Sequence, residues 1–425
     1  MSESIIRSRP LFLLNGIMTT AFIAGLVFSW RAVSSISTAG MIISGLFATT
    51  TSGRNAAWGK ELTRLLIASI LFYLAEVLAA VLHPPFTDHL HNLQVKSSLL
   101  FLPIACYVSM PVMQAGKTYL LRAFCILLTI ASVYCLTIQF LSGHTTELTN
   151  AILYHELVSP IGQHAVLFSL YIFLALIILT EDITDKGDIF PFLITLPLIL
   201  FFCLFLFLLS SKLVILLCLG YFFYKLFSAT ALNRNWKNGI AVTVIIAGVL
   251  LLATPNRIQH RFRELATGNI ALLRQQQFSP DIYFNAWEFR LLQFRFVPEI
   301  LNEQQGWITG TGPGHAQMLL DKKYTDLHMY QGVAGSGKKG YLGYHTHDQW
   351  LQSLLEAGSV GLIAFLGLLY FLIRICIRQR STLYTFMTLS LIAFSFTDAV
   401  LASQYGIMLF LFFIHFFYTK PGTNT

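Results

Sequence analysis

The sequence predicts an all-α polytopic membrane protein, with about twelve transmembrane helices and one large, partly helical loop between the ninth and the tenth. Hydrophobic residues make up 55% of the chain and charged residues only 11%, whereas a typical soluble domain carries about 25% charged residues. The mean hydropathy is +0.66. Apolar runs of the length that crosses a hydrocarbon core of ~30 Å recur along the chain. The stretch 254–350 contains no such run.

Twelve apolar runs predict the membrane spans. The first, 11–30, is too long for the core of a signal peptide, and no small-residue cleavage site follows it. The second, 34–50, is rich in Ser, Thr and Gly, so eleven spans is an open alternative. The runs lie at 11–30, 34–50, 64–82, 98–114, 119–140, 162–180, 190–210, 212–228, 239–254, 358–376, 383–398 and 403–418. The chain therefore divides into helices one to nine (1–253), the loop (254–350) and helices ten to twelve (351–425).

The placement of Lys and Arg orients these helices. With both termini inside, fifteen Lys and Arg fall in inside segments, and only Arg31, Lys96 and Lys212 fall in short outside loops. Because cytoplasmic loops of membrane proteins are enriched in these residues, this orientation is favoured and the long loop is external. The formal charge of +8 therefore reflects membrane topology and predicts no nucleic-acid partner. All six cysteines lie in or beside apolar runs, which predicts neither disulfides nor a zinc site.

The long loop itself is predicted to fold against the membrane. Its segment Phe284–Phe294 has the spacing of a helix with one apolar face, and its aromatic content is unlike that of a disordered segment. The stretch 332–339 is similar to a P-loop motif. It ends in Lys, however, where the motif needs a magnesium-binding Ser or Thr. We interpret that stretch as a mobile loop.

Reactive side chains are densest where the loop enters the tenth helix. Asp348 or Thr346 is predicted to cap a helix over 349–357, which would end or bend at Gly358. His347 then lies at a helix N-terminus, where free backbone N–H groups favour phosphates. A neutral imidazole there can take a proton from a hydroxyl. The alternative is a histidine that only caps the helix or lies at the membrane interface.

His345 and His347 could also be half of a metal site. Further ligands would then have to come from His315, His328 or elsewhere, and no ligand spacing indicates one. The sequence therefore predicts no metal and no other cofactor.

The spacing of His347-Asp348, nine residues and Gly358-x-x-Gly361 resembles the signature of the O-antigen ligase (WaaL) family. That signature reads His, then Asn, Ser or Gln, nine residues, and Gly-x-x-Gly, so Asp348 differs from it at the second position. The family's plan is also similar over essentially the whole chain. It has twelve spans, internal termini and a large periplasmic loop between spans nine and ten, in a GT-C-like fold.

The resemblance implies a set of site residues. The stretch from Arg290 to Gly310-Thr-Gly-Pro-Gly314 is similar to the family's Arg, helix and Gly-x-Gly block, so Arg290 would bind the diphosphate of the donor and His347 would be catalytic. Lys212 matches a second family arginine. It keeps the charge but lacks the bidentate fork that suits a diphosphate, and it could equally extend to the membrane interface. His345 completes the predicted diphosphate-binding set. Arg295 lies roughly 140° around the helix from Arg290, so both cannot face one ligand.

The resemblance implies a glycosyltransferase of the bacterial inner membrane with its active site facing the periplasm. It would move a glycan from undecaprenyl diphosphate to lipid A-core or another glycan acceptor, without metal or nucleotide and in contact with membrane lipids. Alternatives with the same plan are an O-antigen polymerase (Wzy) and a protein oligosaccharyltransferase. A lipid-linked glycan flippase or other transporter would explain the spans without the structured loop.

Within the spans, Glu76 and Asp398 are costly charges in lipid. We interpret them as paired side chains, with a place on a substrate path as the alternative.

Overall fold

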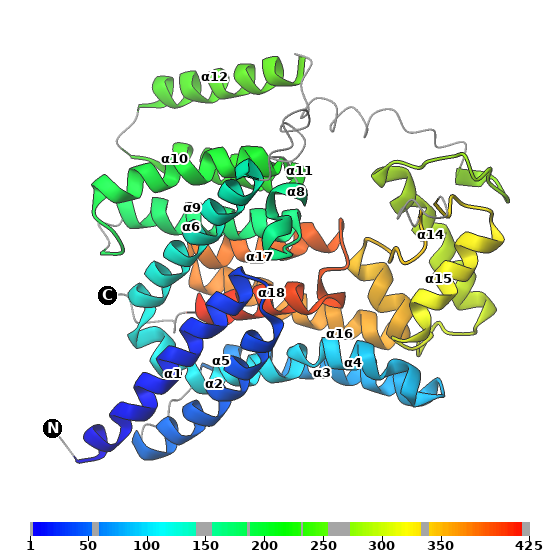
Figure 1. The fold of residues 1–425 in the computed structure, drawn as a ribbon, viewed down its shortest axis with the longest axis horizontal. Helices are drawn as coiled ribbons and strands as arrows, with labels where there is room; N and C mark the ends of the chain where they lie inside the picture. The colour runs from blue at the N-terminus through cyan, green and yellow to red at the C-terminus, as the bar shows by residue number, and fades with distance from the viewer. Residues whose placement is uncertain are drawn as a thin grey trace.

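The computed structural model describes residues 3–52, 59–141, 155–184, 188–230, 233–253, 273–332 and 340–418. Within these ranges all regular structure is helical, and no strand is present. Most of the long helices run roughly along the long axis of the molecule, and α14 and α15 lie together at one end of the bundle (Figure 1). The first part of the predicted loop, 254–272, and the P-loop-like stretch 333–339 lie outside the described residues.

Each predicted apolar run falls on a helix in the described part of the chain. The helices are α1 (Glu3–Val27), α2 (Arg31–Ser52), α3 (Lys60–Leu82), α5 (Ser98–Ala115), α6 (Lys117–Leu141), α9 (Ala165–Thr184), α10 (Phe192–Leu209), α11 (Lys212–Ser228), α12 (Arg234–Ala253), α16 (Gln349–Gln379), α17 (Thr382–Ser395) and α18 (Gln404–Phe416). Short helical segments connect them: η1 (Phe86–His89), α4 (Leu90–Lys96), α8 (His155–Val158), η2 (Ser159–Ile161) and η4 (Val400–Ala402).

Eight helical segments of the described chain are long and apolar enough to cross a membrane, and α17 and α18 are shorter apolar helices. The polytopic all-α class is thereby confirmed, while the number of twelve crossings stays a prediction. Many large apolar side chains face outward, Leu193 with 85% of its surface and Ile36 with 69% among them. Soluble proteins rarely expose apolar surface on this scale, so this surface fits a lipid environment.

Helices α3 and α16 pack against each other in opposite directions. Where α3 begins and α16 ends, Glu61 forms ion pairs with Arg374, at 3.1 Å, and with Arg378. The other end of the pair carries the start of α16, next to His347. The cluster of arginines and the candidate site are therefore at opposite ends of these two helices, as the predicted topology requires.

The described part of the long loop forms a unit with its own apolar core. It contains α14 (Ala286–Glu303) and α15 (His315–Asp326), and its core includes Phe284, Phe289 and Tyr341. Asn285 caps α14 in a capping box with Glu288, which satisfies backbone N–H groups at both positions. The helix predicted over 284–294 is confirmed, but it begins at Ala286 and extends to Glu303.

A bend in α16 joins this unit to the bundle. Ala357 and Gly358 have non-helical dihedral angles, and Gly358 has a φ of +64°, a region that favours glycine. Two carbonyl groups of α16 next to the bend accept hydrogen bonds from the loop after α14. Thr311 N–H donates to Leu355 O and Gly312 N–H to Glu356 O, both at 2.9 Å. The predicted bend at Gly358 is thus confirmed, and the Gly-x-Gly segment is packed against it.

Candidate functional site

The candidate site lies on the segment 345–348, where the loop unit, meaning the described part of the long loop, meets the bundle. Asp348 is the N-cap of α16, and its side chain accepts a hydrogen bond from Leu351 N–H at 2.9 Å. This confirms one of the two predicted capping residues. The cap fixes the start of the helix, so the residues before it are held in a turn beside a helix N-terminus.

His347 has a backbone conformation that few side chains adopt. Its φ is +49°, a strained region for residues other than glycine that costs on the order of 1 to 3 kcal/mol and often marks a functional site. Its N–H donates to Nδ1 of His345 at 3.0 Å. Between them, Thr346 is fully buried, and both its N–H and its hydroxyl lie in hydrogen-bond contact with Oε1 of Gln352. Neighbouring groups thus hold this turn on both sides.

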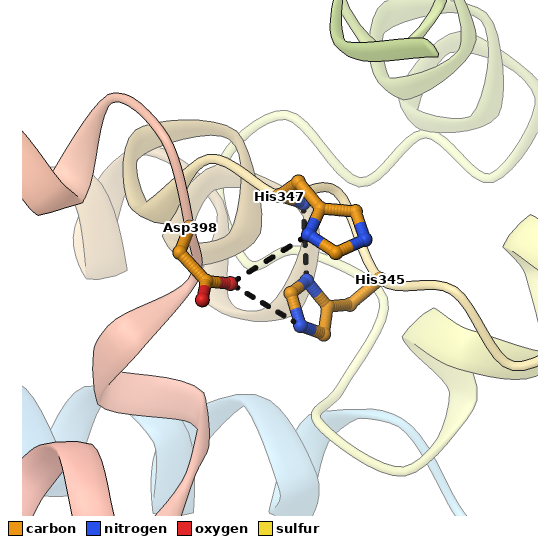
Figure 2. A group of neighbouring side chains, drawn as sticks. All are labelled: His345, His347 and Asp398. Atoms are coloured by element: carbon orange, nitrogen blue, oxygen red, sulfur yellow. Dashed lines mark hydrogen bonds and ion pairs between the residues drawn. The ribbon is translucent and has the colours of Figure 1, made fainter. Parts of the chain in front are cut away.

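Asp398, in the connection between α17 and α18, faces both histidines (Figure 2). Its Oδ1 lies 3.5 Å from Nε2 of His345 and 3.7 Å from Nδ1 of His347. The second distance is too long for a good hydrogen bond, so it describes an electrostatic contact that a small movement would tighten. Figure 2 shows the other ring nitrogen of His347, Nε2, pointing away from Asp398. An imidazole oriented by a carboxylate on one side can exchange a proton on the other.

The charges of the cluster are set by burial and by one another. Burial and the neighbouring His347 lower the pKa of His345 to about 4, against a smaller opposing effect of Asp398. His345 is therefore neutral at neutral pH, and since its Nδ1 accepts a hydrogen bond, its proton lies on Nε2, facing Asp398. Burial raises the pKa of Asp398, but the two facing imidazoles outweigh it and hold that pKa at about 2. Asp398 is thus an anion at neutral pH.

Arg290 reaches the same place from α14. Its Nη2 and Nε donate to the carbonyl of Thr397, at 2.7 and 3.2 Å, and its Nη1 to Ala286 O at 3.2 Å. The preceding residue, Phe289, places its ring edge-on to His347 with centroids 5.7 Å apart. One turn of α14 therefore contacts both the histidine and the residue next to Asp398, so Arg290, His345 and His347 lie in one region.

The other candidates lie as follows. Arg295 pairs with Glu299 at 2.8 Å, away from Thr397, which agrees with the choice of Arg290. Lys212 is the half-buried first residue of α11, after a turn in which Ser210 has a φ of +49°. Its role toward a diphosphate stays a prediction.

The cluster also has the composition of a metal site. Ligand atoms of His345, His347 and Asp398 all lie within 4.8 Å of one another, and two imidazoles with one carboxylate suit zinc and related metals. Asp398 would be the third ligand of such a site, whereas His315, the candidate named from the sequence, faces Asp88 at 3.4 Å. A metal would hold both histidines as neutral ligands, so it competes with a role of His347 as a proton acceptor.

Two members of this region were missed at the sequence level. Asp398 was interpreted mainly as a structural charge, although an ionisable residue at the end of an apolar run is itself a signal. The second is His164, which precedes α9. Burial is the main cause of its lowered pKa, but Asp398 and His347 also affect it, so it lies within their electrostatic reach.

No protein-family model matches the chain, and no curated protein is recognisably similar to it in sequence.

Proposed function

We propose that this protein is a membrane glycosyltransferase of the O-antigen ligase type, which moves a glycan from undecaprenyl diphosphate to lipid A-core at the periplasmic face of the inner membrane. One observation carries the proposal: Arg290, His347 and Asp398, from three distant parts of the chain, meet where the loop unit joins the bundle. A substrate anchored in the membrane by its lipid would present its diphosphate at that level.

In the proposed reaction His347 is the general base. Its Nε2 takes the proton of an acceptor hydroxyl, and the oxygen of that hydroxyl attacks the anomeric carbon of the donor sugar. The bond from that carbon to the diphosphate oxygen breaks, and undecaprenyl diphosphate leaves with the bonding electron pair. Asp398 faces Nδ1 and stabilises the imidazolium that forms, as a buried carboxylate does for a catalytic histidine elsewhere.

Arg290 is proposed to stabilise the charge of the leaving diphosphate. A guanidinium has five N–H donors in a planar fork, and its bonds to Thr397 O and Ala286 O fix the plane of that fork. Donors that are fixed before the reaction stabilise developing charge without reorganisation. Lys212 and His345 complete the proposed diphosphate-binding set. Diphosphate is already a good leaving group, so the reaction calls for neither metal nor nucleotide.

The test uses bacterial cells that lack their own ligase. Wild type and His347→Ala are expressed at matched levels, and the lipopolysaccharide is separated on a gel. The proposal expects polymer attached to core only with the wild type. Unattached polymer accumulating with both variants would contradict the ligase, and a changed chain-length distribution would instead favour a polymerase. Activity of the purified protein that is lost with EDTA and restored by zinc would favour the metal site.

A further inference from the structure

A group of three buried charges lies where α3, α4 and α16 meet, and the proposed reaction uses none of them. Glu76, Lys96 and Glu356 are each at most 3% exposed. Nζ of Lys96 lies 2.9 Å from Oε1 of Glu76 and also pairs with Oε2 of Glu356. This confirms the pairing predicted for Glu76, and it places Lys96, expected in an outside loop, in the interior. Breaking such a pair leaves an uncompensated buried charge and is strongly destabilising.

Hydrogen bonds lead from this group directly to the turn that carries the two histidines. Nε2 of Gln352 donates to Oε1 of Glu356 at 3.0 Å. Oε1 of Gln352 accepts from the N–H of Thr346 at 3.3 Å and lies 2.9 Å from its hydroxyl, whose single proton is shared with Asp348 O at 2.7 Å. Because a carboxylate can only accept, it turns the amide so that its NH₂ group faces Glu356 and its oxygen faces Thr346.

We propose that Lys96, Glu356 and Gln352 form a positioning network for the active-site turn. Lys96 fixes Glu356, Glu356 fixes the amide of Gln352, and Gln352 holds Thr346, which is the residue between His345 and His347. The network keeps His347 in its strained conformation, with φ of +49°, and so keeps its ring beside Asp398. It acts through Thr346 and touches no substrate. The catalytic consequence rests on the proposed function, whereas the ordering of the turn does not.

The network is tested by Gln352→Met, which cuts its link to Thr346 and leaves the three charges paired. The matched control is Gln114→Met. Gln114 lies at the end of α5 remote from Lys96, and its partly buried Nε2 donates to Tyr418 O at 2.7 Å, so the control also loses an amide hydrogen bond. Both variants are compared with the wild type in thermal stability and in hydrogen–deuterium exchange of the peptide that covers 344–349.

The expected result is faster exchange in 344–349 for Gln352→Met and no change there for Gln114→Met. With an active enzyme, kcat of Gln352→Met falls by about tenfold to a hundredfold, the loss that a small misplacement of a catalytic group produces. The KM for the lipid-linked donor changes less than kcat, since Arg290 and Lys212 bind the diphosphate from outside this turn and only His345 lies on it. A purely structural role would lower thermal stability without lowering kcat more than it changes KM.

A double variant tests the direction of the bonds. Gln352→Glu combined with Glu356→Gln exchanges donor and acceptor. The carboxylate at position 352 can accept from Thr346 and from the amide at position 356, and the summed charge of positions 76, 96, 352 and 356 is unchanged. Slow exchange in 344–349 and at least tenfold higher kcat than either single variant are expected.

Exchange in 344–349 that is the same in Gln352→Met, Gln114→Met and the wild type overturns the network, and so does a folded double variant that exchanges as fast as the single variants. Failure of the proposed function looks different: the wild type transfers no glycan, or His347→Ala remains active, while the exchange comparison still decides the network.

Discussion

Replacing Asp398 by Asn is expected to slow the reaction strongly while leaving the fold intact, because Asn has the same shape and lacks the charge. The affected interaction spans 3.7 Å, between Oδ1 of Asp398 and Nδ1 of His347. At that separation two unit charges near a protein surface interact with about 4 kcal/mol. The two side chains are 27% and 30% exposed, and water screens part of this.

After that discount, about 1.4 to 3 kcal/mol of stabilisation of the imidazolium is lost, which is a tenfold to hundredfold fall in kcat. The assay is initial-rate transfer of glycan by protein purified in detergent, with folding checked by thermal denaturation. Asp88→Asn is the matched control, since Asp88 faces His315 at 3.4 Å and lies outside the cluster. If Asp398→Asn is folded and within twofold of the wild type, Asp398 does not orient the base.

Three more predictions concern single side chains around the site. Arg290→Lys keeps the charge but cannot form the forked contact that Arg290 makes with Thr397 O, so the KM for the lipid-linked donor should rise by about tenfold, measured by donor titration; an unchanged KM would remove Arg290 from the donor site. The pKa of His345 is lowered from 6.5 to about 4. The stability that His345 gives the turn is therefore fully present above pH 6.5 and is lost as the pH falls toward 4. At that pH a proton binds Nδ1 and displaces the hydrogen bond from His347 N–H. His345→Asn offers an acceptor that does not titrate there, and its profile of kcat against pH should lack an acid limb near pH 4 to 5; a limb identical to that of the wild type would refute this assignment. Gly358→Ala places a Cβ 2.3 Å from Ile308 O at a φ of +64° and should cost at least about 2 kcal/mol of stability. Gly367→Ala on the same helix has open space around it and should be neutral or slightly stabilising. Equal melting temperatures for the two variants would contradict the packing described for the bend.

Local features of the site could be predicted because their causes are local in sequence. The cap at Asp348, the bend at Gly358 and the amphipathic helix around Phe289 each follow from residues within a turn or two of one another. The membrane spans follow from composition and length alone. These signals place His347 at a helix N-terminus before any tertiary contact is known.

Contacts between distant segments could not be predicted in this way. Asp398 faces His347 only because the connection between α17 and α18 packs beside the start of α16, and no pattern in the sequence encodes that proximity. Lys96 likewise counted as one charge of an outside loop, whereas the structure buries it between two glutamates. The sequence alone does not distinguish a buried lysine from a lysine in a loop, because the difference comes from the packing of distant segments.

The most direct measurement of the central claim is glycan transfer by the purified protein in lipid vesicles that contain undecaprenyl diphosphate-linked glycan and lipid A-core. We expect the wild type to form glycan-capped core and release undecaprenyl diphosphate in equal amounts with EDTA present, and His347→Ala to be at least about a hundredfold slower. A wild type that forms no capped core, or a His347→Ala variant as active as the wild type, would contradict the account.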